Sequence, residues 1–139
     1  MLEVLVSVAL AGTLIVSLYA GFSGGFAVVQ LARENLRGTQ ILQEKMETIR
    51  LYTWAQINTP GFIPETFTDF FYATSTNLEA AGMVYTGTVA IATAPFPTED
   101  YAADLKTVTV RVNWTSGGIV RNREMTTYIS RYGLQNYIY

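Results

Sequence analysis

The chain has 139 residues and a mass of 15.4 kDa, which suits one modest domain and excludes a multi-domain enzyme or a long solenoid. It contains no cysteine and no histidine, so catalysis by serine–histidine or cysteine–histidine pairs and zinc ligation by these side chains are excluded. The formal net charge of −2 gives no basic field for nucleic acid, and 50% hydrophobic against 14% charged residues indicates a membrane or a large partner surface.

The amino-terminal segment is the least polar part of the chain. After Glu3 no charged residue occurs until Arg33, which leaves 29 uncharged positions. As a helix this stretch is about 44 Å long, against about 30 Å for the hydrocarbon core of a bilayer, so residues 1–30 are predicted to be a membrane or filament-core segment. A glycine inside a helix costs about 1 kcal/mol relative to alanine. A loosened stretch of helix is therefore expected at Gly21, Gly24 and Gly25.

Two plainer interpretations of this segment stay open. Ala9-Leu10-Ala11 resembles the cleavage site of a secretory signal, although no basic region and no long apolar stretch precede it. A single-span anchor needs only length and hydrophobicity, but the carboxylate of Glu3 argues against a simple anchor. That acid is either a solvated terminal charge, or it is neutralised by a cation of another chain when such helices pack together.

The residues around this acid carry a family resemblance. The run Leu2-Glu3-Val4-Leu5-Val6-Ser7-Val8-Ala9-Leu10 resembles the start of type IV pilins and type II secretion pseudopilins, whose precursors carry a motif like G-F-T-L-I-E-V-L-V. The resemblance implies a structural subunit of an extracellular helical filament of identical subunits, held in the inner membrane before assembly and handled by pilus assembly machinery. It also implies that Glu3 pairs with the terminal amine, here that of Met1, of a neighbouring subunit.

The same resemblance implies that the filament core consists of packed amino-terminal helices. Apolar side chains of the first turns are expected to line that core: Leu2, Val4, Leu5, Val6, Val8, Leu10, Leu14, Ile15, Leu18 and Phe22. A type II secretion pseudopilin is the nearest alternative within this family. From another class, the alternative is a membrane-anchored β-sheet module that binds a soluble ligand.

The helix is predicted to continue to residue 53 as an amphipathic segment. Leu42, Met46, Ile49 and Thr53 recur at helical spacing and form one stripe, which is interpreted as the contact with a sheet. A helix over residues 1–53 is longer than a domain of 15.4 kDa is wide, so its apolar half is expected to project from the domain.

A connecting loop, with space for a short helix, is predicted over residues 54–82, because Pro60 and Pro64 prevent the helix from continuing. An antiparallel sheet with a carboxy-terminal hairpin is predicted over residues 83–139. The fold class is therefore α+β, a long amino-terminal helix packed by its carboxy-terminal half on a small antiparallel sheet.

The hairpin carries the clearest strand pattern of the chain. One predicted strand alternates polar residues with four apolar ones, Val108, Val110, Val112 and Trp114. Ser116-Gly117-Gly118 predicts the turn, because glycine accepts a positive φ. The return strand is expected to run from Ile119 to Ser130. Met125, Thr127 and Ile129 are expected to face the core, and Arg121 and Arg123 are expected to be surface charges.

Candidate chemistry in the rest of the sequence is weak. Glu99, Asp100 and Asp104 offer hard oxygen ligands for Ca²⁺, but the glycine and ligand spacing of an EF-hand are missing, which favours solvated acids and no metal site. There is no catalytic pairing of carboxylates and no phosphate-binding glycine loop. No catalytic residue and no cofactor are assigned, and the chain is not expected to be an enzyme.

Overall fold

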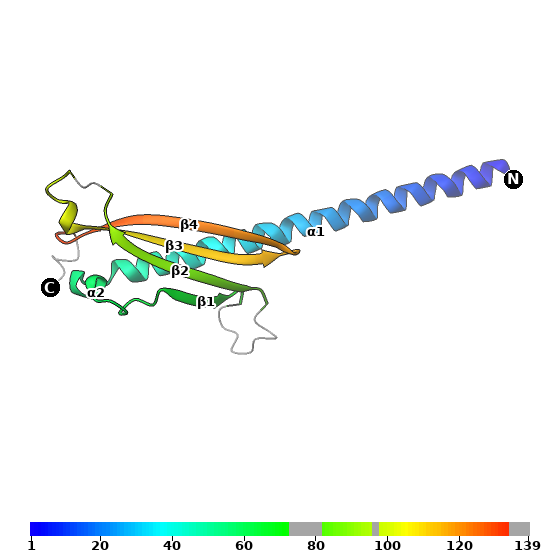
Figure 1. Ribbon diagram of the computed structural model, residues 1–139. Coiled ribbons are helices and arrows are strands. Elements are labelled where there is room, and N and C mark those ends of the chain that lie inside the picture. Colours follow the sequence, from blue (N-terminus) through cyan, green and yellow to red (C-terminus); the bar gives the residue numbers. More distant parts are fainter. Residues whose placement is uncertain (73–81, 96–97, 134–139) are drawn as a thin grey trace. The chain divides into compact units, whose positions relative to one another are not determined.

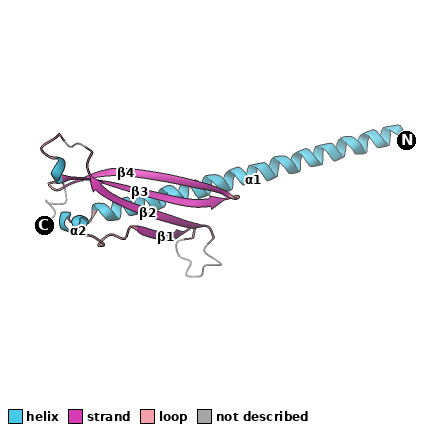
Figure 2. Cartoon of the chain, in the orientation of Figure 1, coloured by secondary structure: helices cyan, strands magenta, loops and turns pink. Residues whose placement is uncertain are grey.

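The computed structural model describes residues 1–72, 82–95 and 98–133 (Figure 1). Helix α1 runs without a break from Leu2 to Arg50, and the short helix α2 follows at Trp54–Asn58. The contacts between residues divide the chain into two compact units, residues 1–35 and residues 36–139. The described part of the second unit also contains strands and a short 3₁₀ helix, η1 (Figure 2): β1 Thr66–Phe70, β2 Val84–Thr93, η1 Ala102–Asp104, β3 Leu105–Ser116 and β4 Ile119–Ser130.

The strands form one antiparallel sheet in the order β1-β2-β3-β4. Strand β3 pairs with β4 without interruption, from Leu105 opposite Ser130 to Ser116 opposite Ile119. The turn between them is the predicted one, with Gly117 and Gly118 at φ 57° and 78°. These values lie in the left-handed region that favours glycine. The predicted hairpin is therefore confirmed, including the bounds of its second strand.

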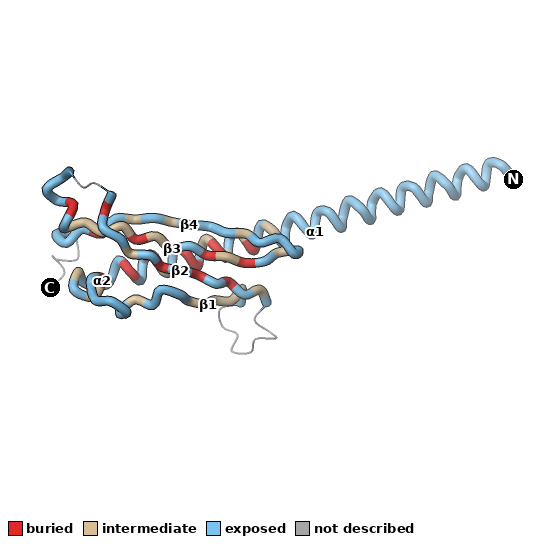
Figure 3. The backbone as a smooth tube through the Cα atoms, viewed as in Figure 1, coloured by how far each residue is buried: buried red, intermediate tan, exposed pale blue. Residues whose placement is uncertain are grey.

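The core of the second unit lies between one face of the sheet and the carboxy-terminal part of α1 (Figure 3). The even-numbered residues of β3 from Val108 to Trp114 are buried, as their alternation predicted. The helix contributes Leu42, Met46 and Ile49, as its stripe predicted. The remaining buried core residues are Ile41, Ile57, Tyr85, Val89 and Ile129. The α+β fold class is confirmed.

A glycine on β2 makes space for an aromatic ring on β1. Phe67 pairs with Gly87 across the two strands, and a Cβ atom placed on Gly87 would overlap the Phe67 ring. The ammonium group of Lys45 also lies over this ring, 4.8 Å from its centroid. The edge strand β1 is thus held against β2 by the Phe67 ring, which packs on the backbone of Gly87.

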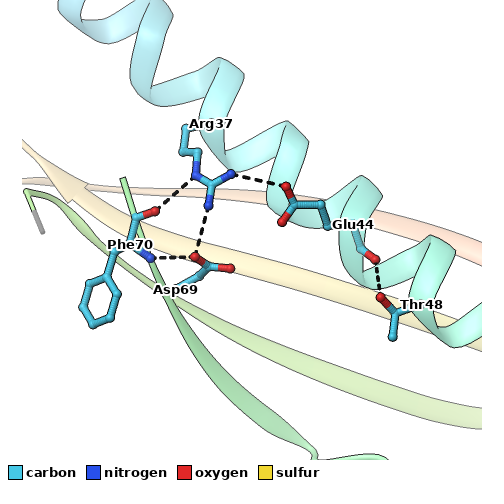
Figure 4. Close-up of polar contacts among 5 residues, drawn as sticks. All are labelled: Arg37, Glu44, Thr48, Asp69 and Phe70. Carbon is cyan, nitrogen blue, oxygen red and sulfur yellow. Dashed lines mark hydrogen bonds and ion pairs between the residues drawn. The ribbon is translucent and has the colours of Figure 1, made fainter. Parts of the chain in front are cut away.

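A hydrogen-bonded arginine joins α1 to the same edge strand (Figure 4). Arg37 donates from Nε to the Phe70 carbonyl at 3.1 Å and from Nη2 to Asp69 Oδ1 at 3.1 Å. Its Nη1 is 3.4 Å from Glu44 Oε1. Asp69 Oδ1 also accepts the Phe70 backbone N–H at 2.8 Å, so one partly buried guanidinium organises the end of β1.

The structure corrects the predicted end of the long helix. Helix α1 ends at Arg50, not at residue 53, and Thr53 is exposed instead of belonging to the buried stripe. Thr53 is the N-cap of α2: its side chain accepts the Gln56 N–H, and the Gln56 side chain accepts the Thr53 N–H. This reciprocal capping box starts a new helix and so ends the old one.

The predicted connecting loop also contains regular structure. Within residues 54–82 lie α2 and the strand β1, while residues 73–81 are outside the described ranges. Helix α1 continues through Gly21, Gly24 and Gly25. One further expectation differs from the structure, because Arg121 is half-buried. It pairs with the buried Trp114 on the helix-facing side of the sheet, whereas Arg123, on the same side opposite Val112, is exposed as expected.

Candidate functional site

The candidate site is the apolar first part of α1. Every residue from 1 to 30 is exposed. Leu10, Leu14, Ile15 and Val16 each expose between 61% and 69% of their surface, and at about 100° per residue they point to all sides of the helix. A helix that is apolar on every side is normally buried in a protein core or in a membrane.

All the residues predicted for a filament core lie in this segment. Each is more than half exposed, from 51% for Val6 to 80% for Leu2. Soluble monomers rarely leave so large a continuous apolar surface in water. Sequence reasoning did not name five other exposed apolar residues of the same run: Val16, Tyr19, Phe26, Val28 and Val29. The same uncharged stretch was the signal that could have found them.

Three hydroxyl groups of this segment donate to carbonyl groups of the helix itself. Ser7 Oγ donates to the Glu3 carbonyl at 2.9 Å, and Ser17 Oγ donates to the Thr13 carbonyl at 2.7 Å. Thr13 Oγ1 donates to the Leu10 carbonyl at 2.8 Å. Such bonds remove the need for water at these side chains, which makes the segment suited to an apolar environment. By length and composition, the helix is able to cross a membrane.

The charges of this unit are confined to its two ends. Glu3 lies in the first turn of α1, where the positive end of the helix dipole favours a carboxylate. The Met1 carbonyl accepts the Leu5 N–H at 3.3 Å. Glu3 forms no ion pair within the described ranges. Its charge is thus placed where a second chain can reach it.

The acidic residues between β2 and β3 were the weak calcium candidate of the sequence. Within the described ranges, no three acidic side chains come together as metal ligands. Asp104 lies in η1 and pairs instead with Arg131, with Oδ1 and Nη1 3.3 Å apart. Glu99 and Asp100 are exposed on the loop before η1. The weak calcium candidate is therefore not supported by their positions.

A second concave feature lies in the other unit. A groove of about 500 Å³ is bounded by α2, the loop that follows it and strand β2. Two charged side chains reach it, Glu65 and Lys106. Its apolar lining includes Ile57, Pro60, Ile63, Val89 and Ile91. Among the described residues that line the groove, no hydroxyl group is paired with a base.

Comparison of the chain with protein-family models, with curated proteins and with solved structures finds no match. The functional argument therefore depends on the residues of the chain and on their positions. The exposed apolar helix is the feature that most needs a functional explanation, because no described part of the chain covers it.

Proposed function

We propose that this chain is a structural subunit of an extracellular type IV pilus-like helical filament. The observation that carries the proposal is the run of 30 exposed residues, in which Glu3 is the one charged side chain and apolar groups point to every side. The start motif from Leu2 to Leu10 supports it through its resemblance to pilins and pseudopilins. Before assembly the segment resides in the inner membrane, and afterwards it is buried among copies of itself.

The energetics of burial favour such a polymer outside the cell. Burying about 1,000 Å² of apolar surface is worth a gross 25 kcal/mol or so against water, at about 25 cal/mol per Å². Against lipid tails the gain is smaller, because the tails are already apolar, and close packing must decide assembly there. The filament is therefore persistent in water, whereas its growth needs a machine that extracts subunits from the membrane.

Glu3 supplies the specific interaction between subunits in the proposed filament. A carboxylate moved among packed apolar helices is costly unless a cation neutralises it. The terminal amine of Met1 on a neighbouring copy is the proposed cation, because it lies at the same end of an identical helix. The pairing fixes how far one subunit is shifted along its neighbour, a role that hydrophobic contact alone performs poorly.

A membrane-anchored binding module is the second candidate, and the groove beside α2 is the observation that favours it. In that case the chain stays monomeric in detergent, and a fragment that lacks residues 1–32 keeps its ligand. A type II secretion pseudopilin shares every feature used above. A gene neighbourhood with a secretin and several pseudopilins favours secretion, and a neighbouring retraction ATPase favours a pilus.

Glu3→Ala tests the proposal, with Glu47→Ala as the matched control. Both residues are exposed glutamates of α1, and Glu47 forms a surface ion pair with Arg50. Electron microscopy and mass spectrometry of material sheared from cells should find filaments of this chain in wild type and in the Glu47 variant. The Glu3 variant should reach the membrane and yield few filaments. Normal filament yield from it would remove the role given to Glu3, and no wild-type filaments would refute the proposed function.

A further inference from the structure

The charged residues of the second unit are unevenly distributed along its sheet. Two arginines, Arg121 and Arg123, lie near the hairpin that joins β3 and β4. Two acids, Glu99 and Asp100, lie on the loop before η1, which the contact of Asp104 with Arg131 holds at the far end of β4. Figure 1 shows the hairpin and this loop at opposite ends of the sheet.

Within residues 1–72, 82–95 and 98–133, the basic end, Arg121 and Arg123, forms no ion pair with an acid. Neither guanidinium forms an ion pair or a hydrogen bond with the described part of the chain, and Arg121 Nε is buried without an acceptor there. The closest acid along the strand, Glu124, is already held by Arg111 on the other face of the sheet. Among the described residues of the unit, no acid compensates the charge of this end.

The acidic end, Glu99 and Asp100, is likewise without an ion pair to any described residue. Both side chains are exposed, and neither pairs with a described cation. Arg131 is occupied by Asp104. Lys106 faces the groove that Glu65 also lines, on the helix side of the sheet. Because about ten residues of β4 separate the two ends, roughly 33 Å at 3.3 Å per residue, they cannot neutralise each other within one copy.

We propose that copies of this chain contact one another head to tail, with the basic end of one sheet against the acidic end of the next. This inference rests on the proposed function, because it names the second contact between subunits of the same polymer. A contact between two different surfaces passes from copy to copy, and identical copies joined in this way form an open helical chain when the rotation between them does not close a ring. Exposed charge pairs add little affinity individually, but opposed charges select orientation and register, and like charges exclude them.

Two double variants of the full-length chain test the contact. Arg121→Glu/Arg123→Glu makes both ends acidic, and Glu99→Lys/Asp100→Lys makes both ends basic. Each variant alone should lower the yield of sheared filaments about tenfold or more, because like charges then meet at every joint. Co-expression of the two should restore the yield, since an acidic end again meets a basic one. The fourfold exchange, with all four charges swapped, should restore it as well.

The control exchanges charges that lie in the groove instead. Glu65→Lys/Lys106→Glu should leave the yield within twofold or so of wild type, because neither side chain belongs to the two ends. Wild-type yield from both end variants overturns the head-to-tail contact while the proposed function stands. Failure of both co-expression and the fourfold exchange to restore filaments also overturns it, since misfolding then explains the loss. Absence of wild-type filaments overturns the proposed function and this contact together.

Discussion

Adding one methyl group to the second strand of the sheet should destabilise the protein markedly. Gly87→Ala places a Cβ where the Phe67 ring now lies, so the ring must swing away from β2. The displaced ring loses part of its burial against the core and its contact with Lys45. Overpacking of this kind costs about 1–3 kcal/mol.

The net effect is smaller than the steric cost. Replacing glycine by alanine also restricts the unfolded chain, which favours folding by about 0.4–1 kcal/mol. We therefore expect Gly87→Ala to lower the free energy of unfolding by about 1–2 kcal/mol. In a Phe67→Ala background the obstacle is gone, so the same substitution should be neutral or slightly stabilising.

Urea unfolding of the full-length chain in detergent, followed by tryptophan fluorescence, measures this cycle. Trp114 is buried in the same core and reports its loss. The four proteins are wild type, the two single variants and the double variant. Equal destabilisation by Gly87→Ala with and without the Phe67 ring would refute the reasoning, because the cost would then belong to the backbone and not to the ring.

Three further predictions concern the second unit. Arg37→Ala should lower the free energy of unfolding by about 1–3 kcal/mol, because it leaves Asp69 without its partly buried partner. In the same urea titration, Arg50→Ala should change that free energy by less than about 0.5 kcal/mol, because its ion pair is exposed. Thr53→Ala should cost about 1 kcal/mol through loss of the capping box, and Thr53→Ser should recover most of it in thermal unfolding. A fragment of residues 36–139 should be a folded monomer in plain buffer by sedimentation, since it contains the whole described core; a fragment that unfolds or aggregates contradicts this.

The elements that are determined by residues close together in sequence were predicted correctly. Alternation in β3, the glycines of its turn and the helical stripe each follow from residues close together in sequence, and the structure confirms them. The capping box at Thr53 and Gln56 is also visible in the sequence, and it predicts that α1 ends before Thr53.

Other features depend on contacts that the local sequence does not reveal. Strand β1 has five residues and little alternation, and it is held by Arg37 from 32 positions away and by a ring over Gly87. Arg121 lies on the helix-facing side of the sheet because it pairs with Trp114. A charged residue in a strand sequence gives no signal of that orientation. The apolar helix was found from composition alone, because exclusion of charge over its whole length is itself the signal.

Cysteine labelling tests most directly whether the apolar helix is buried among copies of itself. The chain has no native cysteine, so Leu14→Cys and Thr88→Cys each introduce one thiol, the first on the apolar helix and the second on the exposed outer face of the sheet. In intact filaments sheared from cells, the proposed function predicts that a maleimide labels the cysteine at 88 rapidly and the cysteine at 14 only after detergent denaturation. Equally fast labelling of both positions in the intact surface material would contradict it.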